Sequence, residues 1–138
     1  MNISFFLIPK QEVTFLDKNS TLRQALEKME YHKYSAIPIL DKNGRYIGTL
    51  TEGDLLWKMK NTPGLMFENT NKIMINDIPW KMRNRPVRIN ARMEDLIELA
   101  ITQNFIPVVD DQDIFIGIVR RREIIEYTSK FINQQNAT

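Results

Sequence analysis

The chain has 138 residues, enough for one compact domain or for two half-domains that share a core. Its 19 basic and 17 acidic residues give a net charge of +2, too small to indicate binding to nucleic acid or to a membrane surface. The lack of cysteine excludes disulfides, and the single histidine argues against a zinc site. No apolar run approaches the roughly 18 residues of a membrane span, and the first residues lack a basic leader, so we expect a cytoplasmic protein.

The first half of the chain predicts strand, helix, strand, strand and helix in that order. Apolar residues recur at helical spacing over 22–29, and Asn19 or Ser20 is expected to cap that helix. Two β-rich runs follow, joined by residues 42–45, whose Asn-Gly pair readily takes the positive φ angles of a tight hairpin turn. A closing helix is expected from about residue 54. The second of the two strands is expected over 46–50.

The connector and the C-terminal tail carry weaker patterns. Residues 61–64 predict a loop, and residues 71–79 a short helix that ends before its proline. A brief strand is expected over 87–89. The polar tail 133–138 is expected to be frayed.

The second half repeats the first. Pro107 follows Pro38 by 69 positions, and Gly117 follows Gly48 by the same 69. An apolar stripe over 93–100, capped by Asn90, repeats the first helix. Because neither copy buries a core well by itself, we predict an α+β fold of two βαββα repeats packed sheet to sheet with pseudo-twofold symmetry and two clefts. The division is repeat 1 over 1–62, a connector over 63–72 and repeat 2 over 73–138.

Each repeat ends a strand with polar groups at the start of a helix. In the first repeat, the Thr51 hydroxyl can cap the helix where free amides attract anions, and Asp54 can accept from the hydroxyls of a ribose. These two residues therefore suit a ribose-phosphate ligand. The simpler alternative is that Thr51 is only an N-cap and Asp54 only a favourable first-turn acid.

The repeated phrase resembles the CBS motif, named after cystathionine β-synthase, and two tandem copies resemble a CBS pair, or Bateman module. Pro38 and Pro107 each precede the motif glycine by ten positions. The resemblance implies adenine-nucleotide binding in clefts that mix both repeats. In one cleft it implies the residues Thr51, Asp54, Phe105 and Ile106, and in the other Arg120, Glu123, Val13, Thr14, Tyr34, Ser35 and Ala36.

The second motif departs from the family pattern, because Arg120 replaces the threonine and Glu123 the aspartate. With Arg121 and Arg122 it forms the densest positive cluster, and guanidinium groups bind phosphate bidentately. The alternative is a solvated basic face at a helix start, where the helix dipole disfavours cations. The second half is also similar to small stand-alone CBS proteins of Gram-positive bacteria that sense cyclic di-AMP, while AMP, ADP and ATP remain open.

The expected function is a sensor without catalysis or a cofactor. Binding of an adenine nucleotide or cyclic di-AMP would shift a conformational equilibrium, and a partner protein, still unknown, would receive the signal. By resemblance we expect a homodimer, formed through exposed helices at the repeat junction. The alternatives are an adaptor module whose clefts stay empty and, less favoured, a nucleotide hydrolase. Nucleic-acid and membrane partners are not expected.

Overall fold

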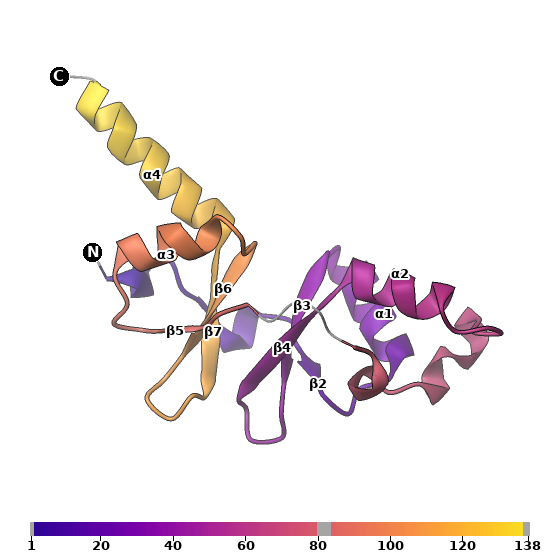
Figure 1. Cartoon of the computed structure of the whole chain (residues 1–138). Coiled ribbons are helices and arrows are strands. Elements are labelled where there is room, and N and C mark those ends of the chain that lie inside the picture. Colours follow the sequence, from indigo (N-terminus) through magenta and orange to yellow (C-terminus); the bar gives the residue numbers. More distant parts are fainter. Residues whose placement is uncertain (1, 80–83, 137–138) are drawn as a thin grey trace. The chain divides into compact units, whose positions relative to one another are not determined.

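The computed structural model describes residues 2–79 and 84–136 and contains two compact units (Figure 1). We call residues 14–83 the central unit, and residues 1–13 together with 84–138 the terminal unit. Each unit holds one sheet and a pair of α-helices, which confirms the α+β class with two repeats. The units divide the chain differently from the sequence repeats, because residues 1–13 pack with the second repeat.

The central unit carries a three-stranded sheet in the order β2-β3-β4, with β2 parallel and β4 antiparallel to β3. Its elements are β2 (Leu16–Asp17), α1 (Leu22–His32), β3 (Ala36–Leu40), β4 (Tyr46–Thr51) and α2 (Glu52–Lys60), followed by the 3₁₀ helices η3 (Phe67–Lys72) and η4 (Ile75–Asp77). One apolar face of the sheet and the predicted stripe of α1 form its core. That core includes Leu16, Leu22, Ala25, Met29, Ile37, Ile39, Leu50, Leu55, Ile75 and Ile78.

The terminal unit carries a four-stranded sheet in the order β1-β7-β6-β5. Its elements are η1 (Ile3–Phe5), β1 (Ile8–Pro9), η2 (Lys10–Glu12), β5 (Val87–Arg88), α3 (Met93–Ala100), β6 (Phe105–Val109), β7 (Phe115–Arg120) and α4 (Arg121–Asn136). The N-terminal segment joins this unit through β1, which pairs with β7, and through the edge of the Phe6 ring, whose centroid lies 5.6 Å from that of Tyr127. Gly117 permits the strand pairing, because a Cβ there would lie 2.2 Å from the carbonyl oxygen of Ile8.

The two hairpins have the same register. Pro38 pairs with Thr49 and Pro107 with Ile118, and each hairpin has a register shift near its turn. In both turns an aspartate side chain accepts two backbone hydrogen bonds. Oδ1 of Asp41 accepts from the N–H groups of Asn43 and Arg45 at 2.8 and 2.9 Å. Oδ1 of Asp110 does the same at 2.8 and 3.0 Å. The predicted hairpins are therefore confirmed, including the one whose turn lacks Asn-Gly.

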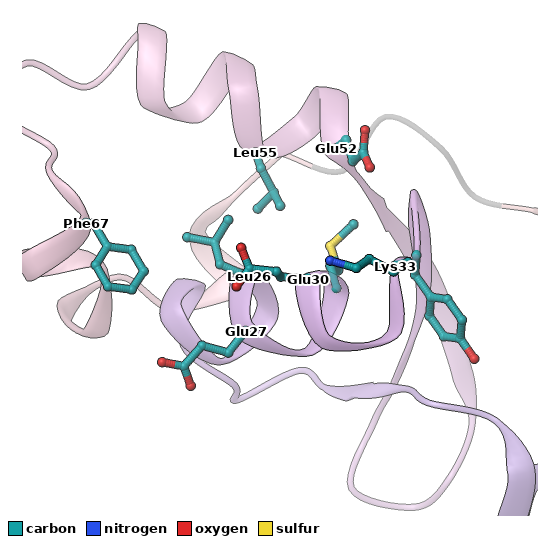
Figure 2. A pocket seen from close by; sticks show the side chains of 9 residues that line it. Leu26, Glu27, Glu30, Lys33, Glu52, Leu55 and Phe67 are labelled. Atoms are coloured by element: carbon teal, nitrogen blue, oxygen red, sulfur yellow. The ribbon is translucent and has the colours of Figure 1, made fainter.

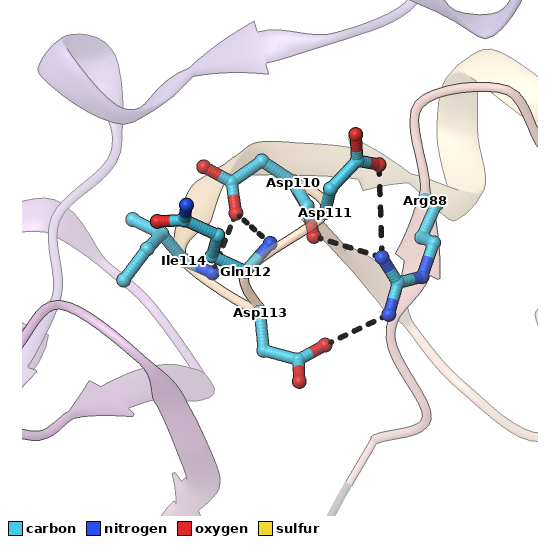
Figure 3. A network of polar contacts seen from close by, with 6 residues as sticks. All are labelled: Arg88, Asp110, Asp111, Gln112, Asp113 and Ile114. Carbon is cyan, nitrogen blue, oxygen red and sulfur yellow. Dashed lines mark hydrogen bonds and ion pairs between the residues drawn. The ribbon is translucent and has the colours of Figure 1, made fainter.

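Arg88 adds a second set of contacts to the turn of the terminal hairpin (Figure 3). Its guanidinium lies 3.7 Å from Asp111 Oδ1 and 3.3 Å from Asp113 Oδ1. Nη1 also donates to the carbonyl of Asp110 at 3.4 Å. Strand β5 is in this way tied to the turn that follows β6, and the positive charge of Arg88 offsets part of the negative charge of this turn.

Four local predictions were wrong. Thr21, not Asn19 or Ser20, caps α1, because its hydroxyl and the Gln24 side chain satisfy each other's backbone N–H groups. Helix α3 has Arg92 as its N-cap residue, not Asn90. The Asp95 side chain accepts from the Arg92 N–H at 3.3 Å.

Residues 71–79 do not form one helix, because η3 ends at residue 72 and η4 is a separate 3₁₀ turn. Between them, the Ile73 carbonyl accepts from the Leu22 N–H at 2.7 Å and the Ile75 N–H donates to the Ser20 carbonyl at 2.9 Å, which ties the segment to the start of α1. The C-terminal tail, expected to be frayed, is helical as far as Asn136. The last two residues lie outside the described range.

Candidate functional site

The predicted site residues of the first repeat meet where β3 begins and β4 ends. We call Tyr34, Ser35, Ala36, Thr51 and Asp54 the central corner. Ala36 pairs with Thr51 across the hairpin, and the N–H of the residue after Thr51 donates to the Ser35 carbonyl at 3.0 Å. Ser35 is exposed, while Tyr34, Ala36 and Thr51 are half-buried. The strand pairing therefore places the predicted residues of this repeat side by side.

Thr51 and Asp54 form a capping box at the start of α2. The Thr51 hydroxyl accepts from the Asp54 N–H at 3.2 Å, and Asp54 Oδ2 accepts from the Thr51 N–H at 2.9 Å. Asp54 is buried, with 6% of its surface exposed. Both residues therefore cap the helix, as the simpler alternative predicted. The capping box fixes both side chains at the helix N-terminus, where backbone amides favour anions.

The second repeat has the same backbone corner with other side chains. We call Phe105, Ile106, Arg120 and Glu123 the terminal corner. Phe105 pairs with Arg120 across the hairpin. The N–H of Arg121 donates to the Asn104 carbonyl at 3.0 Å, which repeats the bond found in the first repeat. Phe105 and Ile106 are buried, with 6% and 0% of their surfaces exposed. An ion pair replaces the capping box, because Nε of Arg120 donates to Glu123 Oε1 at 2.9 Å and to Oε2 at 3.1 Å.

The two remaining arginines of the positive cluster point to different partners. Arg121 Nε donates to the carbonyl of Ala100, the last residue of α3, at 2.9 Å, and to that of Gln103 at 3.1 Å. Arg122 Nε donates to Glu126 Oε1 at 3.0 Å on the exposed side of α4. Each of the three guanidinium groups is therefore engaged within the terminal unit. Arg121 in particular holds the end of α3 against the start of α4.

Val13 and Thr14 stand at the border of the two units. Val13 belongs to the terminal unit and is buried, with its N–H donating to the Lys10 carbonyl at 3.1 Å. Thr14 opens the central unit and is half-buried. Each unit thus brings together its own share of the predicted site residues.

Sequence reasoning missed a buried polar cluster beside the terminal corner. Gln103 is 6% exposed; its side-chain amide donates to the carbonyls of Arg85 and Phe105 at 3.2 and 3.3 Å, and its Oε1 accepts from the Arg85 N–H at 2.8 Å. Asn84, 2% exposed, also donates to the Phe105 carbonyl at 3.2 Å. The only signal in the sequence is an uncharged amide next to a buried strand, a pattern too common to single out.

The part of the chain that the structure describes offers no cluster of three or more His, Cys, Asp and Glu side chains suited to a metal ion. In the same residues no helix is long and apolar enough to cross a membrane. The candidate site is accordingly the pair of corners, each built from one hairpin and the helix that follows it.

The model of the CBS domain matches residues 7–61 and 73–130. The chain belongs to the CBS domain family. Its relatives include cyclic di-AMP receptor B of Bacillus subtilis, 26% identical, with 95% of this chain and 88% of the receptor covered.

Two solved structures show the same fold. The CbpB protein of Listeria monocytogenes in complex with c-di-AMP is 21% identical with a TM-score of 0.80, covering 96% of this chain and 98% of CbpB. A structure of CBSX2 in complex with AMP is 23% identical with a TM-score of 0.75, covering 94% of this chain and 97% of that one. Each of these two complexes contains an adenine nucleotide.

Proposed function

We propose that this chain is a non-catalytic regulator that binds an adenine nucleotide at its corners and signals to a partner protein. The observation that carries the proposal is the repeated corner, in which the same strand register places polar side chains at the start of a helix twice. Membership of the CBS domain family supports it, as do the similarity to a cyclic di-AMP receptor and to a CBS protein in complex with AMP. No cofactor is required.

The residues of the central corner have the chemistry of a ribose-phosphate site. Among its hydrogen bonds to described residues, the Asp54 carboxylate uses Oδ2 for the helix cap, which leaves Oδ1 for a ribose hydroxyl. The amides at the start of α2 suit a phosphate.

The terminal corner, beside the positive cluster of Arg120, Arg121 and Arg122, favours the more highly charged ligand. Glu123 offers a carboxylate to a ribose. The ion pair of Arg120 and Glu123 would have to open or share its charge, because both side chains already bind each other. Arg122, on the exposed face, is the freer phosphate contact, while Arg121 acts mainly through the end of α3.

A homodimer completes the proposal. We call the hollow of about 400 Å³ between α3 and α4 the terminal groove, and it is lined mostly by apolar atoms. Ile101 and Ile125 on its walls are 77% and 58% exposed, and α4 extends well past the end of α3 (Figure 1). An aliphatic helix face of this kind, with little charge, is typical of a surface covered by a second copy.

Thermal unfolding with added nucleotides tests the ligand. Cyclic di-AMP, AMP, ADP and ATP are compared with GMP and cyclic di-GMP. A ligand at 100 times its dissociation constant should stabilise the native state by ~2.7 kcal/mol. A shift with cyclic di-AMP alone supports the second-messenger sensor, and a shift with AMP or ATP supports an energy-state sensor centred on Thr51 and Asp54. If no nucleotide shifts the transition, the adaptor reading replaces the proposal.

A pair of matched variants locates the site. Asp54→Asn and Asp95→Asn each alter a carboxylate that accepts from the N-cap N–H of its helix, at 2.9 and 3.3 Å. Both should lower the free energy of unfolding, by about 1 kcal/mol for the buried Asp54 and by less for the exposed Asp95. Only Asp54→Asn should weaken nucleotide binding, by about tenfold or more. Equal nucleotide responses in both variants would contradict the assignment of Asp54.

A further inference from the structure

The central corner presents an open backbone carbonyl, that of Ala36. Ala36 lies opposite Thr51, and the bond of 3.0 Å from the Glu52 N–H to the Ser35 carbonyl flanks this pair. In an antiparallel ladder such a bond marks a non-hydrogen-bonded pair, so the Ala36 N–H and C=O point away from β4. No N–H or O–H group of the described residues donates to this half-buried carbonyl.

The equivalent carbonyl of the terminal corner, that of Phe105, is closed. Phe105 lies opposite Arg120 in the same type of pair, so its carbonyl also points away from β7. There it accepts from the Asn84 side-chain amide at 3.2 Å and from the Gln103 side-chain amide at 3.3 Å. A carbonyl oxygen has two lone pairs, and these two donors occupy both.

The two donors, which we call the amide pair, are held firmly. Asn84 is 2% exposed and Gln103 6%. The Gln103 amide also donates to the Arg85 carbonyl at 3.2 Å, and its Oε1 accepts from the Arg85 N–H at 2.8 Å. Because both N–H bonds of Gln103 and one lone pair of its oxygen are used inside the unit, the side chain has little freedom to turn away from Phe105.

The first repeat has no counterpart of the amide pair. Val13 lies three residues before β2, as Asn84 lies three residues before β5. Tyr34 precedes Ala36 by two positions, as Gln103 precedes Phe105. Neither valine nor tyrosine has a side-chain amide, so the two corners share a backbone and differ in whether its outward carbonyl is available.

We propose that the amide pair makes the two corners unequal, so that the chain recognises the amino group of adenine only at the Ala36 carbonyl and binds one nucleotide per chain. The exocyclic amino group of adenine is a hydrogen-bond donor and requires an acceptor. The Phe105 carbonyl has no acceptor capacity left, whereas the Ala36 carbonyl has. Asn84 and Gln103 act through this carbonyl without touching the ligand. The inference rests on the proposed function, because it concerns the same corners.

The number of bound nucleotides tests the inference. Isothermal titration calorimetry of the full chain, with AMP and separately with cyclic di-AMP, should give one nucleotide per chain. Asn84→Ala/Gln103→Leu frees the Phe105 carbonyl and should add a second, weaker site. Asn84→Ala alone keeps the bonds between Gln103 and Arg85 and frees one lone pair, so it serves where the double variant does not fold.

Ligands without the amino group test the recognition itself. Purine riboside 5′-monophosphate matches AMP, and cyclic di-IMP matches cyclic di-AMP. The parent protein should bind each of these at least about tenfold more weakly than its adenine counterpart, since one hydrogen bond in a partly buried site is lost. Equal affinities would overturn the assignment of the Ala36 carbonyl.

Thr70→Val is the control for a loss of stability alone. Thr70 is fully buried in η3, and its hydroxyl donates to the Phe67 carbonyl at 2.7 Å and accepts from Arg23 Nε at 3.4 Å. This variant should lower the melting temperature, as the amide-pair variants do, but leave one nucleotide per chain. A second site in Thr70→Val would show that loosening of the fold, and not the freed carbonyl, creates it.

The outcomes separate the inference from the proposed function. Two equal sites in the parent protein, or a single site in amide-pair variants that circular dichroism shows to be folded, would overturn only the inference. Failure of AMP, ADP, ATP and cyclic di-AMP to bind the parent protein would overturn the proposed function itself.

Discussion

The central and terminal units share a hairpin register and a strand-to-helix corner, but the space beside their helix pairs differs. In the central unit η3 lies against α1 and makes one wall of an acidic groove, with Glu27, Glu30 and Glu52 in its lining (Figure 2). In the terminal unit the equivalent helices, α3 and α4, line a groove of isoleucines with no acidic side chain. The same fold therefore presents two grooves of different character, one with an acidic rim and one lined mainly by isoleucines.

The corners differ in a similar way. A capping box between neutral and acidic side chains closes the central corner, whereas an ion pair closes the terminal one. The N–H of Glu52 donates to the Ser35 carbonyl in the central corner, and the N–H of Arg121 donates to the Asn104 carbonyl in the terminal corner. The backbone geometry is therefore the same although the side chains differ. The fold sets where a site can form, and the side chains at four or five positions decide which chemistry it has.

The largest effect is expected from breaking the terminal groove. Ile101→Glu/Ile125→Glu places two carboxylates on a face that we assign to a second copy. Because an unpaired charge in an apolar interface is costly, dimer affinity should fall by about 3 kcal/mol or more, about a hundredfold. Light scattering should then show the mass of a single chain, 16.3 kDa, in place of twice that value.

Met66→Glu is the control for this change. Met66 is an exposed apolar residue in the loop between α2 and η3, 61% exposed, and it does not line the terminal groove. It should leave the mass unchanged. A parent protein that is already a single chain at micromolar concentration would contradict the assignment of the second copy.

A smaller effect is expected from the arginines that follow β7. Arg121→Ala removes two charge-assisted hydrogen bonds to the carbonyls at the end of α3, so the free energy of unfolding should fall by about 2 kcal/mol. Arg122→Ala removes only an exposed pair with Glu126 and should cost less than about 0.5 kcal/mol. Urea unfolding measures both values.

The same two variants distinguish a ligand contact from a structural contact in the terminal unit. If Arg121→Ala left stability unchanged but abolished the thermal shift by cyclic di-AMP, Arg121 would be a ligand contact and not the residue that secures α3. Arg122→Ala should weaken cyclic di-AMP binding without changing the stability of the ligand-free protein. The two outcomes separate contacts within the terminal unit from contacts with the ligand.

The difference between what could and could not be predicted follows the range of the interactions. The hairpins were predictable because alternation and turn chemistry are local, and the repeated proline and glycine fixed their register. The role of Arg121 was not, since its acceptors lie about 20 residues earlier at the end of another helix. The helix expected over 71–79 was wrong for the same reason, because the carbonyl of Ile73 and the N–H of Ile75 bond to backbone groups at the distant start of α1.

The smallest expected effect concerns the turn of the central hairpin. The N–H of Arg45, with that of Asn43, hydrogen-bonds the carboxylate of Asp41 and holds its pKa below the ordinary value of 3.8. A lowered pKa means that the ionised carboxylate stabilises the fold above that ordinary value, and that this contribution is lost as the pH falls through the folded value. Asp41→Asn keeps an accepting oxygen but cannot titrate.

The parent protein should therefore be more stable than Asp41→Asn at pH 7, and the difference should shrink from about pH 5 downward. Urea unfolding between pH 7 and pH 3 measures it. Asp110→Asn, in the turn that Arg88 also braces, is the comparison, because Oδ1 of Asp110 accepts the same two backbone bonds. A stability difference for Asp41→Asn that stays constant with pH would show that the hairpin depends on the shape of this side chain and not on its charge.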